Sequence, residues 1–344
     1  MTDPLIDRLD PRVFRDVARH VLDTPTYEWI RSGSGPDFAG DNEAAFGRRR
    51  LRPSVLVDVA SVKTETTLLG ATVAAPVVIG PVGLQKAVHP DGELAMAAGA
   101  ARAGSLLIVA VNATTAIDDI AAAQPTLPLW FQLYNWANRD VLAAVIARAE
   151  AAGVRAIVPL VNTPIGVNHT SPKIGFRLPA GAKFAHFDSS PENTASNSWE
   201  YLDWLRSVTS LPIVPKGIMT RDDASRAVDA GATGIVVSNH GGRQVARSIS
   251  TLDALPDVVA GAGGAEVYLD GGVRSGGDVL IALALGARAV LVARPVLWGM
   301  ALAGADGVTR VLDDLREGLA EDAGMCGIAD IARVPRDLVV DAAG

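Results

Sequence analysis

Cysteine is almost absent from the chain: Cys326 is the only one in 344 residues. A single cysteine cannot form an intrachain disulfide or provide a cysteine-based metal site, so we expect no bound metal. The sequence also lacks any uninterrupted apolar stretch of the roughly 18 residues that a membrane-spanning helix needs. Its first residues lack the basic and apolar segments of a signal peptide. These absences predict a cytoplasmic protein without membrane association.

Basic clusters and aromatic residues are scarce as well. The net charge is −7, aromatic residues make up 5% of the chain, and the one basic run is Arg48-Arg49-Arg50 followed by Arg52. A surface that binds nucleic acid needs a basic patch, so we expect no nucleic-acid partner. The arginine run is interpreted as a solvated face or a site of local ion pairs.

No Gly-x-Gly-x-x-Gly follows the first apolar run, which argues against an open dinucleotide-binding sheet. Short apolar runs instead alternate with helical patterns from residue 76 onward. The predicted strands are Pro76–Gly80, Leu106–Val111, Trp130–Tyr134, Ala156–Val161, Ile213–Lys216, Gly234–Ser238, Val267–Asp270 and Ala289–Ala293. The helical stretches include Gly92–Ala103, Arg139–Ala152, Arg221–Ala230 and Gly276–Leu285.

Eight strands alternating with helices predict an α/β fold, specifically a closed (β/α)8 TIM barrel. We expect one domain over residues 1–344. Within it, residues 1–75 form an N-terminal extension with helices at Asp10–Leu22 and Ala44–Arg50, and residues 76–325 form the barrel. The segment 164–198 is long and rich in Pro, Gly, Asn and Ser, which is typical of an active-site loop.

The segment Ser238-Asn239-His240-Gly241-Gly242-Arg243-Gln244 follows a predicted strand directly. Two glycines allow a sharp turn and a close approach to a ligand. A carboxylate held by Arg243 would then lie beside a base, His240. In isolation the same segment is also compatible with an ordinary polar loop.

The other strand ends are polar too, and in a barrel the site is built there. Asp270-Gly271-Gly272-Val273-Arg274 opens a predicted helix, and Arg294 follows the last strand, so we expect a phosphate site at these two ends. Lys216 ends an apolar strand, and its charge requires a partner. The partner is either a functional anionic or carbonyl group or, in a purely structural role, a carboxylate of the barrel.

Several motifs together resemble the FMN-dependent α-hydroxy-acid dehydrogenase/oxidase family, whose members include glycolate, lactate and mandelate-oxidising enzymes. The similarity runs from about residue 15 to 335. The motifs are Ser32-Gly33, His89-Pro-Asp-Gly-Glu93, Phe131-Gln-Leu-Tyr134, Lys216-Gly217, Ser238 to Gln244, Asp270 to Gly276 and Arg294-Pro295.

The resemblance implies a barrel that binds FMN and oxidises a small-molecule 2-hydroxy acid to the 2-oxo acid. His240 would take a proton from the substrate while a hydride equivalent reaches flavin N5, with Arg243 anchoring the carboxylate and Tyr134 contacting substrate oxygens. Lys216 would stabilise negative charge on the flavin. The implied cofactor residues are Pro81, Val82, Gly83, Gln132, Lys216, Ser238, Asp270, Gly271, Gly272, Arg274, Ala293 and Arg294. By analogy with the family, a homo-oligomer, a tetramer, is expected.

The chain departs from the family pattern on the substrate side. Trp29 replaces a tyrosine, Asn162 replaces the acid that orients the imidazole, and Asn112 stands where a tryptophan is expected. A second substrate arginine is missing, so Arg243 alone would hold the substrate, or His169 or Lys173 from the long loop would compensate. We therefore expect a rebuilt pocket for a bulky or aromatic substrate.

Other functions remain open at this point. They are different chemistry on the same cofactor (oxidative decarboxylation, amine oxidation or oxygenation), a weakly active flavin-binding protein, and a non-redox FMN barrel. Gly83 leaves the electron acceptor undecided. His89 is interpreted as structural, and His20 and His186 as surface residues.

Overall fold

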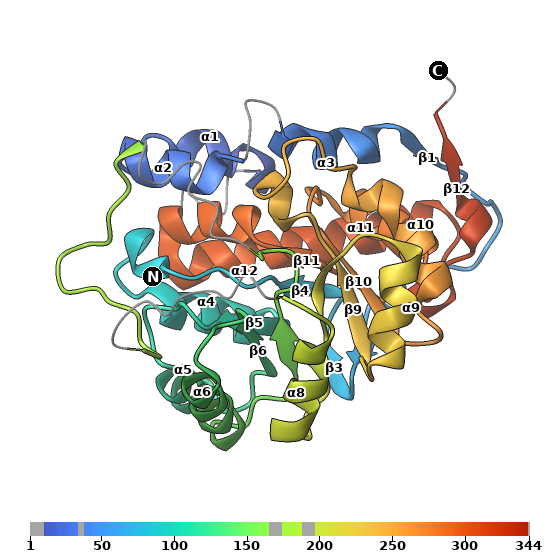
Figure 1. Cartoon of the computed structure of the whole chain (residues 1–344). Coiled ribbons are helices and arrows are strands. Elements are labelled where there is room, and N and C mark those ends of the chain that lie inside the picture. The colour runs from blue at the N-terminus through green and yellow to red at the C-terminus, as the bar shows by residue number, and fades with distance from the viewer. Residues whose placement is uncertain (1–9, 34–37, 165–173, 188–196, 343–344) are drawn as a thin grey trace.

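The computed structural model describes residues 10–33, 38–164, 174–187 and 197–342, and a parallel sheet of eight strands forms its centre (Figure 1). The strands are β4 (Val77–Ile79), β5 (Leu106–Ala110), β6 (Leu129–Leu133), β7 (Ile157–Pro159), β8 (Lys216–Ile218), β9 (Gly234–Val237), β10 (Glu266–Asp270) and β11 (Ala289–Val292). Their order is β7-β6-β5-β4-β11-β10-β9-β8. Parallel bridges Ile157–Ile213 and Leu160–Lys216 join the two ends. The predicted (β/α)8 barrel is therefore confirmed.

A helix follows each barrel strand. These helices are α4 (Gly92–Arg102), α5 (Ile117–Ala123), α6 (Arg139–Ala151), α8 (Glu200–Val208), α9 (Arg221–Asp229), α10 (Thr251–Gly261), α11 (Gly276–Ala284) and α12 (Arg294–Met325). Short 3-10 helices are η3 (Gln85–Ala87), η4 (His240–Gly242), η5 (Ile331–Arg333) and η6 (Arg336–Leu338). No helix in the described ranges is long and apolar enough to cross a membrane.

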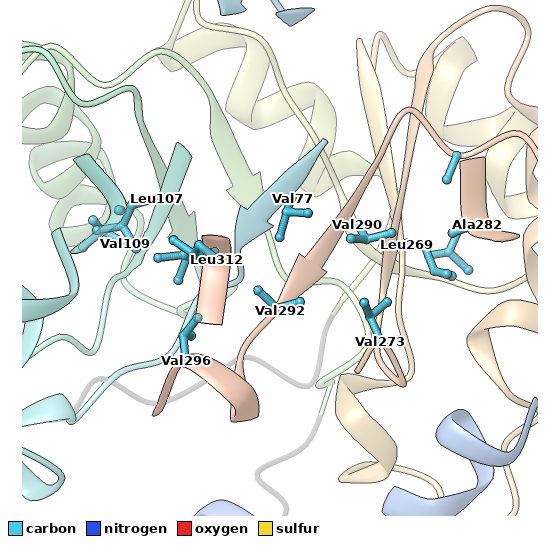
Figure 2. Close-up of a cluster of buried hydrophobic side chains, with 14 of the residues drawn as sticks. Val77, Leu107, Val109, Leu269, Val273, Ala282, Val290, Val292, Val296 and Leu312 are labelled. Atoms are coloured by element: carbon cyan, nitrogen blue, oxygen red, sulfur yellow. The ribbon is translucent and has the colours of Figure 1, made fainter. Parts of the chain in front are cut away.

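Strand alternation divides the buried side chains into two cores. Val77 and Val109 point outward against the helices, where Figure 2 shows them near Val296 and Leu312 of α12. The neighbouring Val78, among others, points into the barrel. Successive side chains on a strand face opposite sides, so a continuous aliphatic run fills both cores. This rigid frame fixes the positions of the loops at the strand ends.

The N-terminal extension packs along one side of the barrel, as Figure 1 shows for α1 to α3. Its elements are η2 (Pro11–Val13), α1 (Phe14–Ala18), α2 (Thr24–Arg31), α3 (Phe38–Gly47), β1 (Arg49–Leu51), β2 (Thr66–Leu68) and β3 (Ala71–Val73). The β2–β3 hairpin contributes Leu68, Ala71 and Val73 to the core inside the barrel. It therefore helps to fill the barrel interior.

Two predictions for the extension are wrong in part. The helix expected over Ala44–Arg50 is α3, which ends at Gly47, and Arg49–Leu51 form β1, paired antiparallel with β12 (Val339–Asp341) near the other end of the chain. That pairing overrides local helix propensity. The helix expected over Asp10–Leu22 is confined to η2 and α1. The arginine run does form ion pairs, since Arg48 and Arg49 both contact Asp253.

Candidate active site

A cavity of about 770 Å³ opens at the carboxyl ends of the barrel strands. It brings together most of the residues predicted from the sequence. These are Trp29, Pro81, Val82, Gly83, Asn112, Gln132, Tyr134, Lys216, His240, Arg243, Asp270, Gly271, Gly272, Arg274, Ala293 and Arg294. Ser238 and Asn162 do not line the cavity. His169 lies outside the described residues, as does part of the loop 164–198.

The backbone after β9 directs His240 into the cavity. His240, Gly241 and Gly242 all have positive φ, at 59°, 64° and 75°. Two of these residues are glycine, which adopts this conformation freely, whereas histidine is strained by roughly 1 kcal/mol or more. The His240 N–H donates to the Ser238 hydroxyl at 3.1 Å. The Gly242 N–H donates to the Asn239 side chain, also at 3.1 Å, which secures the turn.

A buried ionic network of Lys216, Asp270 and Ser238 holds this turn in place. Lys216 Nζ lies 2.6 Å from Asp270 Oδ2. The fully buried Ser238 hydroxyl accepts from Lys216 Nζ at 2.8 Å and donates to Asp270 Oδ2 at 2.6 Å. Desolvation raises the pKa of Asp270, but the Lys216 charge and these hydrogen bonds outweigh it, so the pKa lies below its ordinary value. The barrel carboxylate considered for Lys216 is thus Asp270.

Two guanidinium groups that line the cavity, those of Arg243 and Arg294, have no carboxylate partner among the described residues. Arg243 donates to the carbonyl of Trp29 at 2.7 Å and to that of Ser32 at 3.1 Å. Arg294 donates to the same Ser32 carbonyl at 3.1 Å. Desolvation, followed by the charges of Arg243 and Arg274, lowers the pKa of Arg294 to about 10. A cavity with this excess of positive charge favours anionic ligands.

The Asp270–Gly277 turn differs in one respect from the prediction. The N–H groups of Arg274 and Ser275, just before α11, are not free for an anion, because Asp278 accepts from both in a capping box. Arg274 itself contacts Glu43 at 2.8 Å. An anion at this end would therefore be bound by guanidinium groups, the Gly271–Gly272 turn and the N–H groups of Gly276 and Gly277 that begin α11.

The cavity controls the protonation of His240 and Tyr134. Desolvation, followed by the positive charges of Lys216 and Arg243, lowers the pKa of His240 to about 3, although Asp270 acts in the opposite direction. The imidazole is therefore neutral at pH 7 and able to accept a proton. Desolvation also raises the pKa of Tyr134, so its hydroxyl stays protonated and available as a donor.

Asn162 makes no hydrogen bond to the imidazole among the described residues, unlike the family acid that it replaces. Its Nδ2 donates to the Ser238 carbonyl at 3.0 Å, and its side chain stands against Gly217. Its Oδ1 is buried without a hydrogen-bond partner among the described residues. The ring contact is made by Gln244 instead, which lies 3.0 Å from His240 Nδ1.

Aromatic side chains form one wall of the cavity. Trp29 stacks on Phe176 at a centroid distance of 4.6 Å, and Trp136 meets Phe187 edge-on at 5.0 Å. Trp29, Trp136 and Phe187 line the cavity together with Tyr134. Such a wall offers apolar area and ring faces to a ligand with an aromatic group.

His186 is not a surface residue, so that prediction is wrong. It is 7% exposed and stands edge-on to Phe131. Its Nδ1 lies 2.8 Å from the Val111 carbonyl, and its Nε2 accepts from the Ile117 N–H at 3.0 Å. The segment 174–187 folds back onto the barrel, and no local sequence pattern signals that return.

Asn42 and Glu93, which organise the cavity, were missed as site residues from the sequence. Asn42 and Asn239 exchange a reciprocal pair of amide hydrogen bonds at 2.8 and 2.9 Å, which ties α3 to the His240 turn. Glu93 is 2% exposed and accepts from the backbone of Gln85 and Thr114, which joins the loops after β4 and β5. The sequence offered a signal only for Glu93, which stands in the motif His89-Pro-Asp-Gly-Glu93.

The barrel, its carboxyl-end cavity and the neutral histidine beside unpaired arginines define an enzyme that binds an anionic cofactor and an anionic substrate. The family model for FMN-dependent dehydrogenases matches residues 18–341, and the chain belongs to that family.

The named relatives are oxidases of hydroxy acids. The chain is 40% identical to 2-hydroxyacid oxidase 2 of Bos taurus over 95% of this chain and 96% of the relative. It is 38% identical to L-lactate oxidase of Nostoc sp. over 89% and 91%. A mandelate oxidase variant with (S)-mandelic acid superposes with a TM-score of 0.90 at 39% identity, covering 96% of this chain and 97% of the other.

FMN is the cofactor of this family, and the cavity residues fit it. Gln132 is 3% exposed, yet its Nε2 has no hydrogen-bond partner among the described residues, so it is a free donor at the cavity wall. A Cβ on Gly272 would lie 2.4 Å from the Asn42 carbonyl oxygen, and Gly272 has φ +89°. Only glycine fits this turn, which leads to the arginines that an FMN phosphate requires.

Proposed function

We propose that this protein oxidises a bulky, aromatic 2-hydroxy acid to the 2-oxo acid with FMN. The observation that carries the proposal is the placement of His240, Arg243 and Tyr134 in one cavity beside an aromatic wall. The names of the relatives, which include 2-hydroxyacid oxidase, L-lactate oxidase and mandelate oxidase, support the same reaction class.

Bound FMN supplies the two-electron acceptor. We assign its contacts to the residues that line the cavity at the strand ends, with Lys216 and Gln132 at the ring system and Arg274 and Arg294 at the phosphate. Ser238 does not line the cavity, so we assign it to holding Lys216 in place rather than to direct contact.

Arg243 binds the substrate carboxylate, and Tyr134 donates to a substrate oxygen. The carboxylate places a negative charge near His240, which raises the pKa of the imidazole from its low resting value. His240 then takes the hydroxyl proton and holds it as the substrate becomes a carbonyl compound. Deprotonation is thereby coupled to the presence of a correctly bound acid.

The proposal is tested with a panel of 2-hydroxy acids, an added electron acceptor and chromatographic detection of the 2-oxo acid. We expect mandelate to turn over with a higher kcat/KM than lactate. Arg243→Met should raise KM by about 100-fold, since a charge-assisted pair is worth about 1.5–3 kcal/mol. Arg247→Met, an exposed arginine on the same loop, is the matched control and should leave KM unchanged. Absence of any 2-oxo acid from the whole panel contradicts the proposal.

Three further sequence predictions remain proposals. The single domain over residues 1–344 is supported by a core that joins Phe14 and Phe46 of the extension to the barrel. A homo-oligomer, a tetramer by family analogy, is tested by light scattering. A cytoplasmic location is tested by cell fractionation, because some relatives are named peroxisomal.

A further inference from the structure

The His240 ring is tied to a second barrel loop through Gln244. Gln244 Nε2 lies 3.0 Å from His240 Nδ1 and 2.8 Å from Thr163 Oγ1. Thr163 belongs to the loop after β7, whereas His240 and Gln244 belong to the loop after β9. The contact therefore spans two strand ends and fixes one edge of the imidazole.

Among the residues that the structure describes, no carboxylate takes this position. Asn162, next to Thr163, directs its amide to the Ser238 carbonyl instead. Among the described residues, none lies within hydrogen-bond distance of His240 Nε2, and His240 lines the cavity. The two ring nitrogens thus have different surroundings: Nδ1 faces a neutral amide, and Nε2 is left for a ligand.

We propose that Gln244, held by Thr163, is the positioning residue of the catalytic base: its amide oxygen accepts the Nδ1 proton of His240 and leaves Nε2 free to take the substrate hydroxyl proton. Rotation of the amide by about 180° places Oε1 where Nε2 lies, so that the oxygen makes both contacts. With the oxygen inward, the Thr163 hydroxyl donates to it as well. This inference rests on the proposed 2-hydroxy-acid oxidation.

The chemistry requires this orientation. The proton leaves the substrate oxygen, arrives at Nε2 and gives an imidazolium that still donates from Nδ1 to the amide oxygen. An inward NH2 group would instead fix the neutral ring with its proton on Nε2, where it blocks the base. The same NH2 group would also destabilise the imidazolium, because two donors would then face each other. A neutral amide orients the ring but does not offset the charge of the imidazolium, whereas a carboxylate would do both.

Other charged groups also act on the ring, and they face it from four elements. Lys216 on β8, Arg243 beside η4 and Arg294 on α12 disfavour the cation, whereas Asp270 on β10 favours it. A carboxylate at position 244 adds a second negative charge next to the ring. Gln244→Glu should therefore raise the pKa of His240 and move the acid limb of kcat/KM to higher pH.

The first test is ¹⁵N NMR of the resting, FMN-loaded protein labelled only at its five histidines. The His240 signals are assigned by their loss in His240→Asn. We expect the neutral ring to carry its proton on Nδ1 in the wild type. Gln244→Met should give a mixture of both tautomers, and Thr163→Val a smaller change in the same direction. Retained FMN absorbance verifies that each variant folds.

The second test is kinetic. Gln244→Met should lower kcat/KM for the best 2-hydroxy acid by about 10- to 100-fold, within the range that general-base catalysis supplies. Gln124→Met makes the same change at the end of α5, away from the cavity, and should have no effect.

Two results would overturn the inference: a tautomer unchanged in Gln244→Met together with a pH profile unchanged in Gln244→Glu, or a tautomer lost in Asn162→Ala but kept in Gln244→Met. Should no 2-hydroxy acid be oxidised while the tautomer depends on Gln244, the proposed function fails and the positioning role stands.

Discussion

Replacing Ser238 with alanine should destabilise the protein far more than an ordinary buried serine does. Its hydroxyl is fully buried and makes hydrogen bonds to Lys216, Asp270 and the His240 N–H. A hydrogen bond to a charged group contributes about 1.5–3 kcal/mol, and the direct Lys216–Asp270 contact of 2.6 Å survives the change. We therefore expect Ser238→Ala to lower the free energy of unfolding by about 3 kcal/mol.

Ser105 offers a matched control. It is also buried, but its hydroxyl donates only to the neutral carbonyls of Val77 at 2.8 Å and Leu106 at 3.3 Å. Ser105→Ala should cost about 1 kcal/mol. With an unfolding entropy of roughly 2.1 cal/mol/K per residue, the two losses correspond to Tm decreases of roughly 4 °C and 1 °C.

The assay is urea and thermal unfolding of both variants at saturating FMN, followed by tryptophan fluorescence. Because the two substitutions remove the same atom, their difference isolates the effect of charged partners. Equal losses in the two variants would refute the role assigned to the ionic network.

Three further predictions follow from the same geometry. Gly272→Ala should abolish retention of FMN, because a Cβ there would lie 2.4 Å from the Asn42 carbonyl oxygen; a yellow purified variant would contradict this. Glu93→Gln should lower the free energy of unfolding by about 2 kcal/mol: the amide oxygen can still accept from the Gln85 and Thr114 N–H groups, but the amide nitrogen cannot accept from the Thr114 and Thr115 hydroxyls, and urea titration measures the loss. The pKa of His240 is about 3 in the folded chain against 6.5 in the unfolded chain. Below pH 6.5 the unfolded state therefore binds one more proton than the folded state, and the free energy of unfolding decreases as the pH decreases. The FMN-free wild type should lose roughly 2 kcal/mol more than His240→Asn between pH 6.5 and pH 5, and parallel pH curves would contradict the assignment.

The barrel was predictable because its strands are unbroken aliphatic runs with glycines at the helix ends. Such runs have few alternatives to a parallel sheet buried on both faces. The rule that barrel sites lie at the carboxyl ends of strands then identified His240 and Arg243 from their positions, and it also selected Lys216, although this residue begins β8 and does not end the strand predicted over Ile213–Lys216. The structure places all three in the cavity.

Contacts between distant segments were not predictable in the same way. Asn42 meets Asn239 across 197 positions, and β1 pairs with β12 near the other end of the chain. No local pattern encodes such partners, since they depend on how the extension folds back. Asn162 shows the same limit: its position after β7 was foreseen, but its side chain turns toward Ser238 rather than His240.

The central claim is that this cavity oxidises 2-hydroxy acids with FMN, and anaerobic mixing of the FMN-loaded protein with mandelate tests it most directly. The account predicts that the visible flavin absorbance disappears with mandelate, and that Arg243→Met needs about 100-fold more mandelate to be bleached at the same rate. Flavin that stays oxidised with mandelate, lactate and every other 2-hydroxy acid, yet is bleached by a chemical reductant, would contradict it.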